Sequence, residues 1–163
     1  SGEIFKISLT NGSSVLLYKH PHAITTFAKS RQEILLGDSQ GGLLRLNPDG
    51  TTLELWKEIR QPITAIYKDQ GIFALGYENG RIIIGNLEKG TMEELVGHLS
   101  RITCLQLVNK RLFTSSYDGT VRLWNLGKDN KVGSFVVAEQ KNWIYVFRIE
   151  NDRNLLITVN GKG

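Results

Sequence analysis

Apolar residues in this chain gather in short runs separated by Gly, Asn, Asp and Lys. The stretch from 102 to 138 contains four such runs, at 102–108, 111–117, 120–126 and about 132–138. The runs are rich in β-branched and aromatic residues, and the intervening Asn109-Lys110, Asp118-Gly119 and 127–130 are typical of turns. Helical periodicity is absent, so the pattern predicts a meander of four antiparallel strands.

The same succession of four runs is found twice earlier in the chain. The expected strands there are 24–28, 33–37, 43–47 and 53–56, followed by 63–67, 72–77, 81–86 and 92–96. The ends of the chain differ, because 2–9 and 14–19 correspond to the third and fourth strands of a group, whereas 143–149 and 155–159 correspond to the first and second. The sequence therefore predicts an all-β chain with one four-stranded group split between its two ends.

Two sets of residues repeat at a constant interval of 39 positions. One set consists of the glycines Gly2, Gly41, Gly80 and Gly119, and the other of Ile24, Ile63 and Ile102. Two markers with one period indicate repeats of a single structural unit. A period near 40 residues that is built of strands alone is typical of a β-propeller, in which each repeat forms one blade.

The third repeat resembles the WD-repeat family of β-propellers, whose repeats open with Gly-His and end with Trp-Asp. Here these positions hold Gly97-His98 and Trp124-Asn125. The resemblance implies four blades of 39 residues, with the last blade split so that its strands c and d lie at the N-terminus and a and b at the C-terminus. The other repeats depart from the motif, since the tryptophan position holds Ile7, Leu46 and Gly85.

A set of polar residues in this repeat can satisfy one another in series. The set consists of His98, Thr114, Ser116, Asp118 and Trp124. The indole donates, a hydroxyl accepts and donates, a neutral imidazole does both, and a carboxylate accepts. Thr114 and Ser116 lie on the same face of their strand, which leaves open which hydroxyl takes part. Although the residue types resemble a Ser-His-Asp catalytic set, no oxyanion-hole or nucleophile-elbow pattern accompanies them, so we expect a structural network and no enzyme.

The split blade leaves three possibilities for the assembly of residues 1–163, which we expect to form one propeller unit. The chain closes on itself as a four-bladed ring, or two copies exchange ends in an eight-bladed homodimer, or the chain is part of a longer propeller. Isolated half-blades would otherwise expose unpaired edges. The sequence predicts self-association on this ground.

The charge and the cysteine content bear on the expected function, compartment and ligands. The net charge is +4, from 20 basic and 16 acidic residues, but the cations are scattered, as at Lys128 and Lys131. This pattern indicates solubility, with a nucleic-acid or polyanion surface as the alternative function.

The single cysteine, Cys104, allows no internal disulfide and favours the cytoplasm. No apolar run could span a membrane, and we expect His20 and His22 to lie in a solvated loop with neither metal nor cofactor.

In a propeller the strands mostly pack against one another, so recognition is expected in the rim loops. The candidate partner-binding residues are Arg60, Glu78, Arg101, Tyr117, Lys141 and Trp143. The family resemblance implies that this face binds partners, and Arg, Tyr and Trp are typical of interaction hot spots. Trp143 is either a rim anchor or a core residue. The expected function is a non-catalytic scaffold or sensing module that binds proteins or peptides, with a propeller enzyme as a remote alternative.

Overall fold

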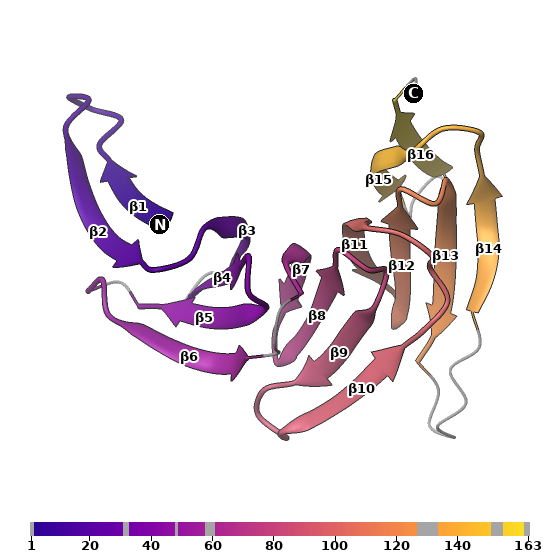
Figure 1. The fold of residues 1–163 in the computed structure, drawn as a ribbon, viewed down its shortest axis with the longest axis horizontal. Coiled ribbons are helices and arrows are strands. Elements are labelled where there is room, and N and C mark those ends of the chain that lie inside the picture. The colour runs from indigo at the N-terminus through magenta and orange to yellow at the C-terminus, as the bar shows by residue number, and fades with distance from the viewer. Residues whose placement is uncertain are drawn as a thin grey trace. The chain divides into compact units, whose positions relative to one another are not determined.

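The computed structural model describes residues 2–30, 33–47, 49–57, 61–126, 134–150 and 155–161. Every regular element in this part of the chain is a β-strand (Figure 1). The chain divides into two compact units, Ser1–Ile63 and Thr64–Gly163. Each unit is therefore described by itself.

The first unit contains a two-stranded and a four-stranded antiparallel sheet. The two-stranded sheet pairs β1 (Gly2–Ile7) with β2 (Ser14–His20). The four-stranded sheet has the order β3 (Ile24–Lys29), β4 (Ile34–Asp38), β5 (Gly42–Leu46) and β6 (Thr52–Lys57). Each strand pairs with its neighbour along the chain, which is the predicted meander.

The second unit contains two four-stranded sheets and one two-stranded sheet. The first has the order β7 (Ile63–Asp69), β8 (Ile72–Tyr77), β9 (Ile82–Asn86) and β10 (Thr91–Leu95). The next has the order β11 (Ile102–Val108), β12 (Arg111–Ser116), β13 (Thr120–Asn125) and β14 (Ser134–Glu139). The last pairs β15 (Ile144–Glu150) with β16 (Leu155–Asn160).

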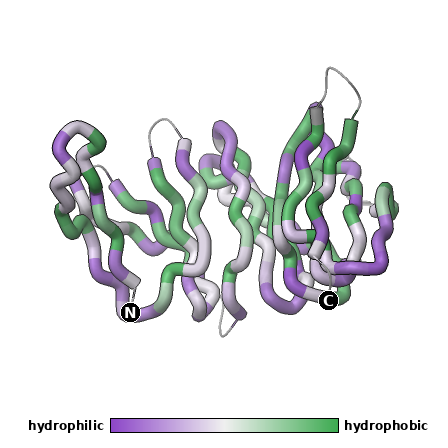
Figure 2. Tube along the Cα trace, turned by 90° about the horizontal axis from the view of Figure 1, so that it is seen from above, coloured by the Kyte–Doolittle hydropathy of each residue, from purple (hydrophilic) through white to green (hydrophobic). Residues whose placement is uncertain are grey.

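These strands confirm the predicted all-β fold and the split between the chain's ends. Observed and predicted bounds agree to within two residues throughout the described part of the chain. The predicted turn at 127–130 and the predicted start of a strand at 132 lie outside the described residues. Figure 2 shows hydrophobic and hydrophilic stretches alternating along the trace.

Turn geometry explains three of the four periodic glycines, while the fourth, Gly2, lies in strand β1. Gly41, Gly80 and Gly119 have φ angles of 85°, 88° and 82°, a region that side chains with a Cβ rarely adopt. The space is also occupied, because a Cβ on Gly119 would lie 2.4 Å from the carbonyl oxygen of Gln140. Each of these glycines lies in the turn between the second and third strands of its sheet.

The isoleucine period has a packing reason. A Cβ on Gly37 would lie 2.8 Å from the side chain of Ile63, and one on Gly76 would lie 2.4 Å from that of Ile102. Ile63 and Ile102 each begin the first strand of a sheet and fit against a glycine in the second strand of the preceding repeat, whereas Ile24 lies against Gly2 of β1. A larger residue there would displace the isoleucine side chain.

Three threonines, also 39 residues apart, tie each repeat to the next. Thr25 donates its hydroxyl to the carbonyl of Ile63, and Thr64 and Thr103 donate in the same way to Ile102 and Ile144, over 2.6 Å in both cases. We call these contacts the threonine staples. Thr25 and Thr103 lie at the bulges of β3 and β11.

Candidate functional site

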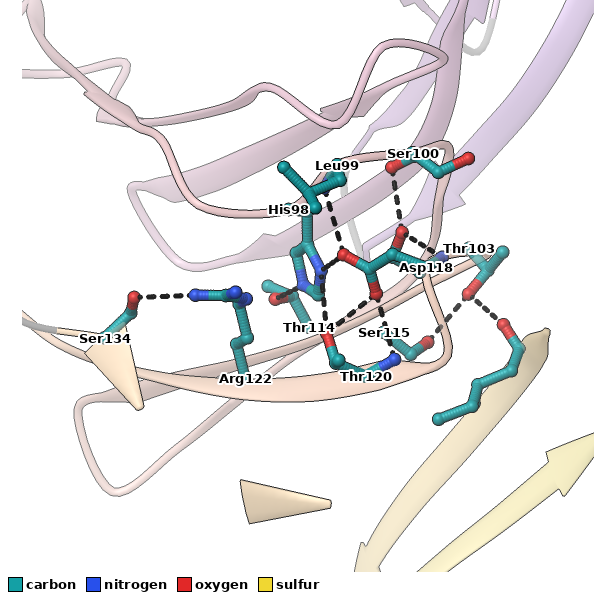
Figure 3. Close-up of polar contacts among 12 residues, drawn as sticks. His98, Leu99, Ser100, Thr103, Thr114, Ser115, Asp118, Thr120, Arg122 and Ser134 are labelled. Atoms are coloured by element: carbon teal, nitrogen blue, oxygen red, sulfur yellow. Dashed lines mark hydrogen bonds and ion pairs between the residues drawn. The ribbon is translucent and has the colours of Figure 1, made fainter. Parts of the chain in front are cut away.

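The third repeat contains a hydrogen-bonded series centred on Thr114, and Figure 3 shows Thr114 together with His98 and Asp118. The Trp124 indole Nε1 donates to Thr114 Oγ1 over 2.8 Å, and this hydroxyl lies 2.7 Å from His98 Nε2. His98 Nδ1 lies 2.8 Å from Asp118 Oδ2. When His98 is neutral with its proton on Nδ1, Thr114 donates to Nε2 and every group in the series is satisfied. Thr114 is therefore the hydroxyl that joins His98 to Trp124.

Ser116 makes different contacts and stays outside that series. Its hydroxyl donates to the carbonyl of Ser100 over 2.8 Å and accepts the amide of Asp118 at 3.0 Å. Asp118 Oδ2 also accepts the amide of Leu99 at 3.0 Å. These bonds fasten the loop before β11 to the turn between β12 and β13.

The Asp118 carboxylate is held in its ionised form. Burial raises its pKa, but hydrogen bonds from His98, from the Thr120 hydroxyl and from the amide of Leu99 outweigh burial and bring the pKa well below the ordinary range. Asp118 is thus an acceptor at neutral pH, with no proton to give.

The first unit contains a second buried His–Asp pair, and the expectation of a solvated loop is wrong for His20. Strand β2 continues to His20, whose Nε2 lies 2.8 Å from Asp38 Oδ2, with both residues buried. Its Nδ1 lies 3.2 Å from the Tyr18 hydroxyl. The described residues contain no group of three side chains suited to hold a metal, although the His22 ring lies near that of His20.

Asp38 was missed by sequence comparison because it lies at a different repeat position from Asp118. Its other carboxylate oxygen accepts the amides of Gln40 and Gly42 at 2.8 and 2.7 Å. Burial raises the pKa of Asp38, but the hydrogen bonds from His20 and from these two amides together lower it by a larger amount. The net shift of the pKa is therefore downward. Asp38, 18 residues after His20, thus forms a hydrogen bond to its histidine, as Asp118, 20 residues after His98, does to His98 in the third repeat.

Four predicted partner-binding residues lie together in the second unit. Arg101 Nη1 donates to Glu78 Oε2 over 2.8 Å, and its guanidinium carbon lies 5.8 Å from the centre of the Tyr117 ring. Tyr117 stacks on Trp143, with ring centres 5.1 Å apart and planes inclined by 16°. Tyr145 meets Tyr117 edge-on at 5.6 Å and 89°. We call these five residues the rim cluster.

The exposure of the rim cluster decides between the two interpretations of Trp143. Its side chain is 48% exposed, so it is not a core residue, and Tyr145 is 43% exposed. Lys141 is exposed in the same loop and has no hydrogen bond or ion pair within the described part of the chain. Arg60 lies outside the described residues.

Tyr145 was not among the predicted residues, although the sequence carries a signal for it. Tyr145 directly follows Ile144, and it occupies the repeat position that holds Thr25, Thr64 and Thr103 in the other repeats. The fourth repeat therefore lacks the threonine staple and places an aromatic ring in the rim cluster instead.

Two further sequence expectations concern a thiol and the membrane. Cys104 is partly buried beside Val121, Ile144 and Phe147, and burial raises its pKa, which keeps the thiol protonated at neutral pH. The described residues include no helix of the length and apolarity needed to cross a bilayer.

Comparison with known families gives a direct match in the third repeat. Residues 90–125 match the family described as WD domain, G-beta repeat. These residues span β10 to β13 and include His98, Thr114, Asp118 and Trp124. The match identifies a WD repeat in residues 90–125, and the four-stranded antiparallel sheets agree with the β-propeller fold of that family.

One curated relative is the probable E3 ubiquitin ligase complex SCF subunit scon-2 of Neurospora crassa. It is 31% identical over 87 residues, which is 51% of this chain and 12% of the relative. The chain thus matches a small part of that protein's length.

Solved structures show the same fold at low sequence identity. A chain in the crystal structure of the mitotic checkpoint complex has a TM-score of 0.81 at 15% identity, covering 98% of this chain and 53% of its own length. The computationally designed Ika8 protein has a TM-score of 0.77 at 21% identity, covering 96% and 49%. This chain therefore spans about half of each.

Proposed function

We propose that this chain is a non-catalytic interaction module that binds partner proteins or peptides through the rim cluster. WD-repeat propellers generally act as protein-interaction scaffolds, and this generality supports the proposal. The observation that carries it is the stack of Arg101, Tyr117 and Trp143, held in place before any partner arrives. Side chains that are already ordered lose less conformational entropy when a partner binds.

The residue types in the rim cluster are those that dominate interface energetics. Tryptophan, tyrosine and arginine combine a large contact area with a polar end, and few other residues contribute as much on truncation. Trp143 is 48% exposed, so about half of the surface of its side chain is open to a partner.

The buried network supports the non-catalytic part of the proposal. Thr114 is fully buried, and its hydroxyl already bonds to both Trp124 and His98. No unengaged nucleophile is therefore presented by this set. The single cysteine supports a reducing compartment such as the cytoplasm, which we include in the proposal.

A double variant tests the proposed interface. Trp143→Ala with Tyr117→Ala removes the stack, and we expect the immobilised chain to capture its partner proteins from a lysate of the source cells at least tenfold less efficiently. Phe135→Ala is the matched control, because Phe135 is 50% exposed on β14, outside the rim cluster. Quantitative mass spectrometry of the captured proteins gives the comparison, and circular dichroism checks the fold. An unchanged set of captured proteins in the double variant would remove the rim cluster from consideration.

We also propose that two copies of the chain associate through the split blade. Val146, Ile157 and Val159 of β15–β16 are between 43% and 53% exposed, and Phe5 and Ile7 of β1 are 50% and 60% exposed. Such bare apolar surfaces beside sheet edges favour pairing with another strand. The pairing of β12 with β13, repeated in the split blade, would place β16 of one copy against β1 of the other.

A further inference from the structure

We infer that the rim cluster recognises a proline-rich segment in the extended polyproline II conformation. This inference rests on the proposed function and names the chemistry of its ligand. Three features support it, namely the balanced charge of the cluster, its free hydrogen-bond donors and the arrangement of its rings.

The charges at the rim cluster are balanced, which favours an uncharged ligand. The Arg101 guanidinium is held by the Glu78 carboxylate at 2.8 Å. The carboxylate of Asp118, next to Tyr117 in the chain, is hydrogen-bonded to His98, Leu99 and Thr120. Lys141, in the loop that leads to Trp143, lies two positions after the exposed Glu139, which ends β14. Among the described residues at the rim cluster, no excess of either sign therefore calls for an acidic or a basic partner.

The cluster presents hydrogen-bond donors without partners. The Tyr117 and Tyr145 hydroxyls and the Trp143 indole N–H have no hydrogen bond within the described part of the chain. An indole N–H only donates, and a phenol donates readily. The complementary ligand is rich in acceptors and poor in donors. A polyproline II segment meets this condition, because its carbonyls bond to nothing within the segment and proline has no N–H.

The ring arrangement also suits this ligand. Trp143 lies nearly parallel to Tyr117, whereas Tyr145 stands perpendicular to it. Proline rings pack on exposed aromatic faces, and the three-residue turn of polyproline II presents them along a regular ridge. The segment is already extended before binding, so little conformational entropy is lost.

Direct binding of defined peptides tests the inference. The probe is a fluorescein-labelled decaproline, compared with labelled peptides of equal length composed of Gly-Ser, of Asp-Glu with one Phe, and of Lys with one Phe. We expect saturable binding of decaproline, read by fluorescence anisotropy, with a matching shift of the Trp143 indole N–H signal in the NMR spectrum. The Gly-Ser peptide should bind at least tenfold more weakly.

Variants locate the binding. Trp143→Ala should weaken decaproline binding about thirtyfold, the size typical of an interface anchor. Tyr145→Phe keeps the ring and removes the donor, so a loss of about fivefold is expected. Phe135→Ala should leave the affinity unchanged. Tighter binding of either charged peptide, or decaproline binding indifferent to Trp143→Ala, would overturn the inference.

The peptide assay and the capture assay separate the two proposals. If decaproline does not bind while Trp143→Ala with Tyr117→Ala still abolishes partner capture, the rim cluster is an interface for another chemistry and this inference is wrong. If the double variant changes neither assay, the proposed function is wrong as well.

Discussion

At the residue scale, one hydroxyl group connects the loop before β11 to the middle of the sheet. Thr114 receives the indole N–H of Trp124 and reaches His98, which in turn meets Asp118. All four are largely or fully shielded from solvent. In such surroundings a hydrogen bond that loses one partner leaves the other group unsatisfied, which costs more than the bond itself contributes.

Removing the Trp124 side chain should therefore destabilise the protein strongly. Trp124 is 1% exposed, and Trp124→Ala leaves a cavity and removes the indole donor from Thr114 Oγ1, which keeps only its bond to His98. We expect a loss of about 3–5 kcal/mol in the free energy of unfolding, measured by urea denaturation. Trp143→Ala, which truncates a half-exposed tryptophan stacked on Tyr117, is the comparison and should cost less, about 0.5–1.5 kcal/mol. An unaltered midpoint in Trp124→Ala would show that this series does not hold the fold together.

The depressed pKa of Asp118 predicts a dependence of stability on pH. The folded pKa lies below the unfolded value, so the ionised carboxylate stabilises the fold at neutral pH, and this contribution is lost as the pH falls from about 4 toward the folded pKa. Asp118→Asn should lower the melting temperature at pH 7 and flatten its decline between about pH 5 and pH 3. Parallel melting curves for the two proteins across that range would contradict the prediction.

At the element scale, neighbouring first strands are joined by the threonine staples and by close packing of isoleucine on a small residue. Thr103 illustrates the staple, since its hydroxyl lies 2.6 Å from the carbonyl of Ile144 and 2.8 Å from Ser115 Oγ. Ser115 stands where the earlier repeats have Gly37 and Gly76. The repeat period in the sequence thus records which positions touch the next repeat.

Loss of a staple should weaken this contact without creating a cavity. Thr103→Val keeps the shape of the side chain and removes both hydrogen bonds, and we expect a loss of about 1–3 kcal/mol in the free energy of unfolding. Thr91→Val is the matched control, because Thr91 is exposed at the start of β10. Faster amide hydrogen exchange confined to β11 and β15 would locate the effect. Equal stability of the two variants would show that the staple contributes nothing.

At the scale of the whole molecule, β15–β16 and β1–β2 each form a two-stranded sheet with exposed apolar side chains. The other sheets have four strands. Two-stranded ribbons are marginally stable in water unless something covers their apolar faces. This comparison is the physical ground for the proposed association of two copies.

The mass in solution tests that association. We expect light scattering after gel filtration to give twice the monomer mass across a hundredfold range of concentration. Val159→Lys places a charge at a bare position of β16 and should shift the mass toward the monomer, whereas Phe135→Lys on β14 should leave it unchanged. A wild-type chain that is monomeric throughout would contradict the proposal.

The sequence by itself determined the strands, their order and the repeat. Each follows from local physics, because β-branched runs favour strands, Gly119 is needed where φ is positive, and Ile102 recurs where a small residue faces it. The split between the chain's ends follows from the same register. These features depend on residues close in sequence or on a constant period.

Only the tertiary structure decided which side chains meet. Sequence comparison could not choose between Thr114 and Ser116, and it missed Asp38, because a carboxylate two positions away in the chain reaches a histidine just as well once the turn is folded. It also left the exposure of Trp143 open and did not predict Tyr145. Contacts of this kind depend on where loops from different repeats converge, and that convergence is a property of the packed sheets rather than of any one segment.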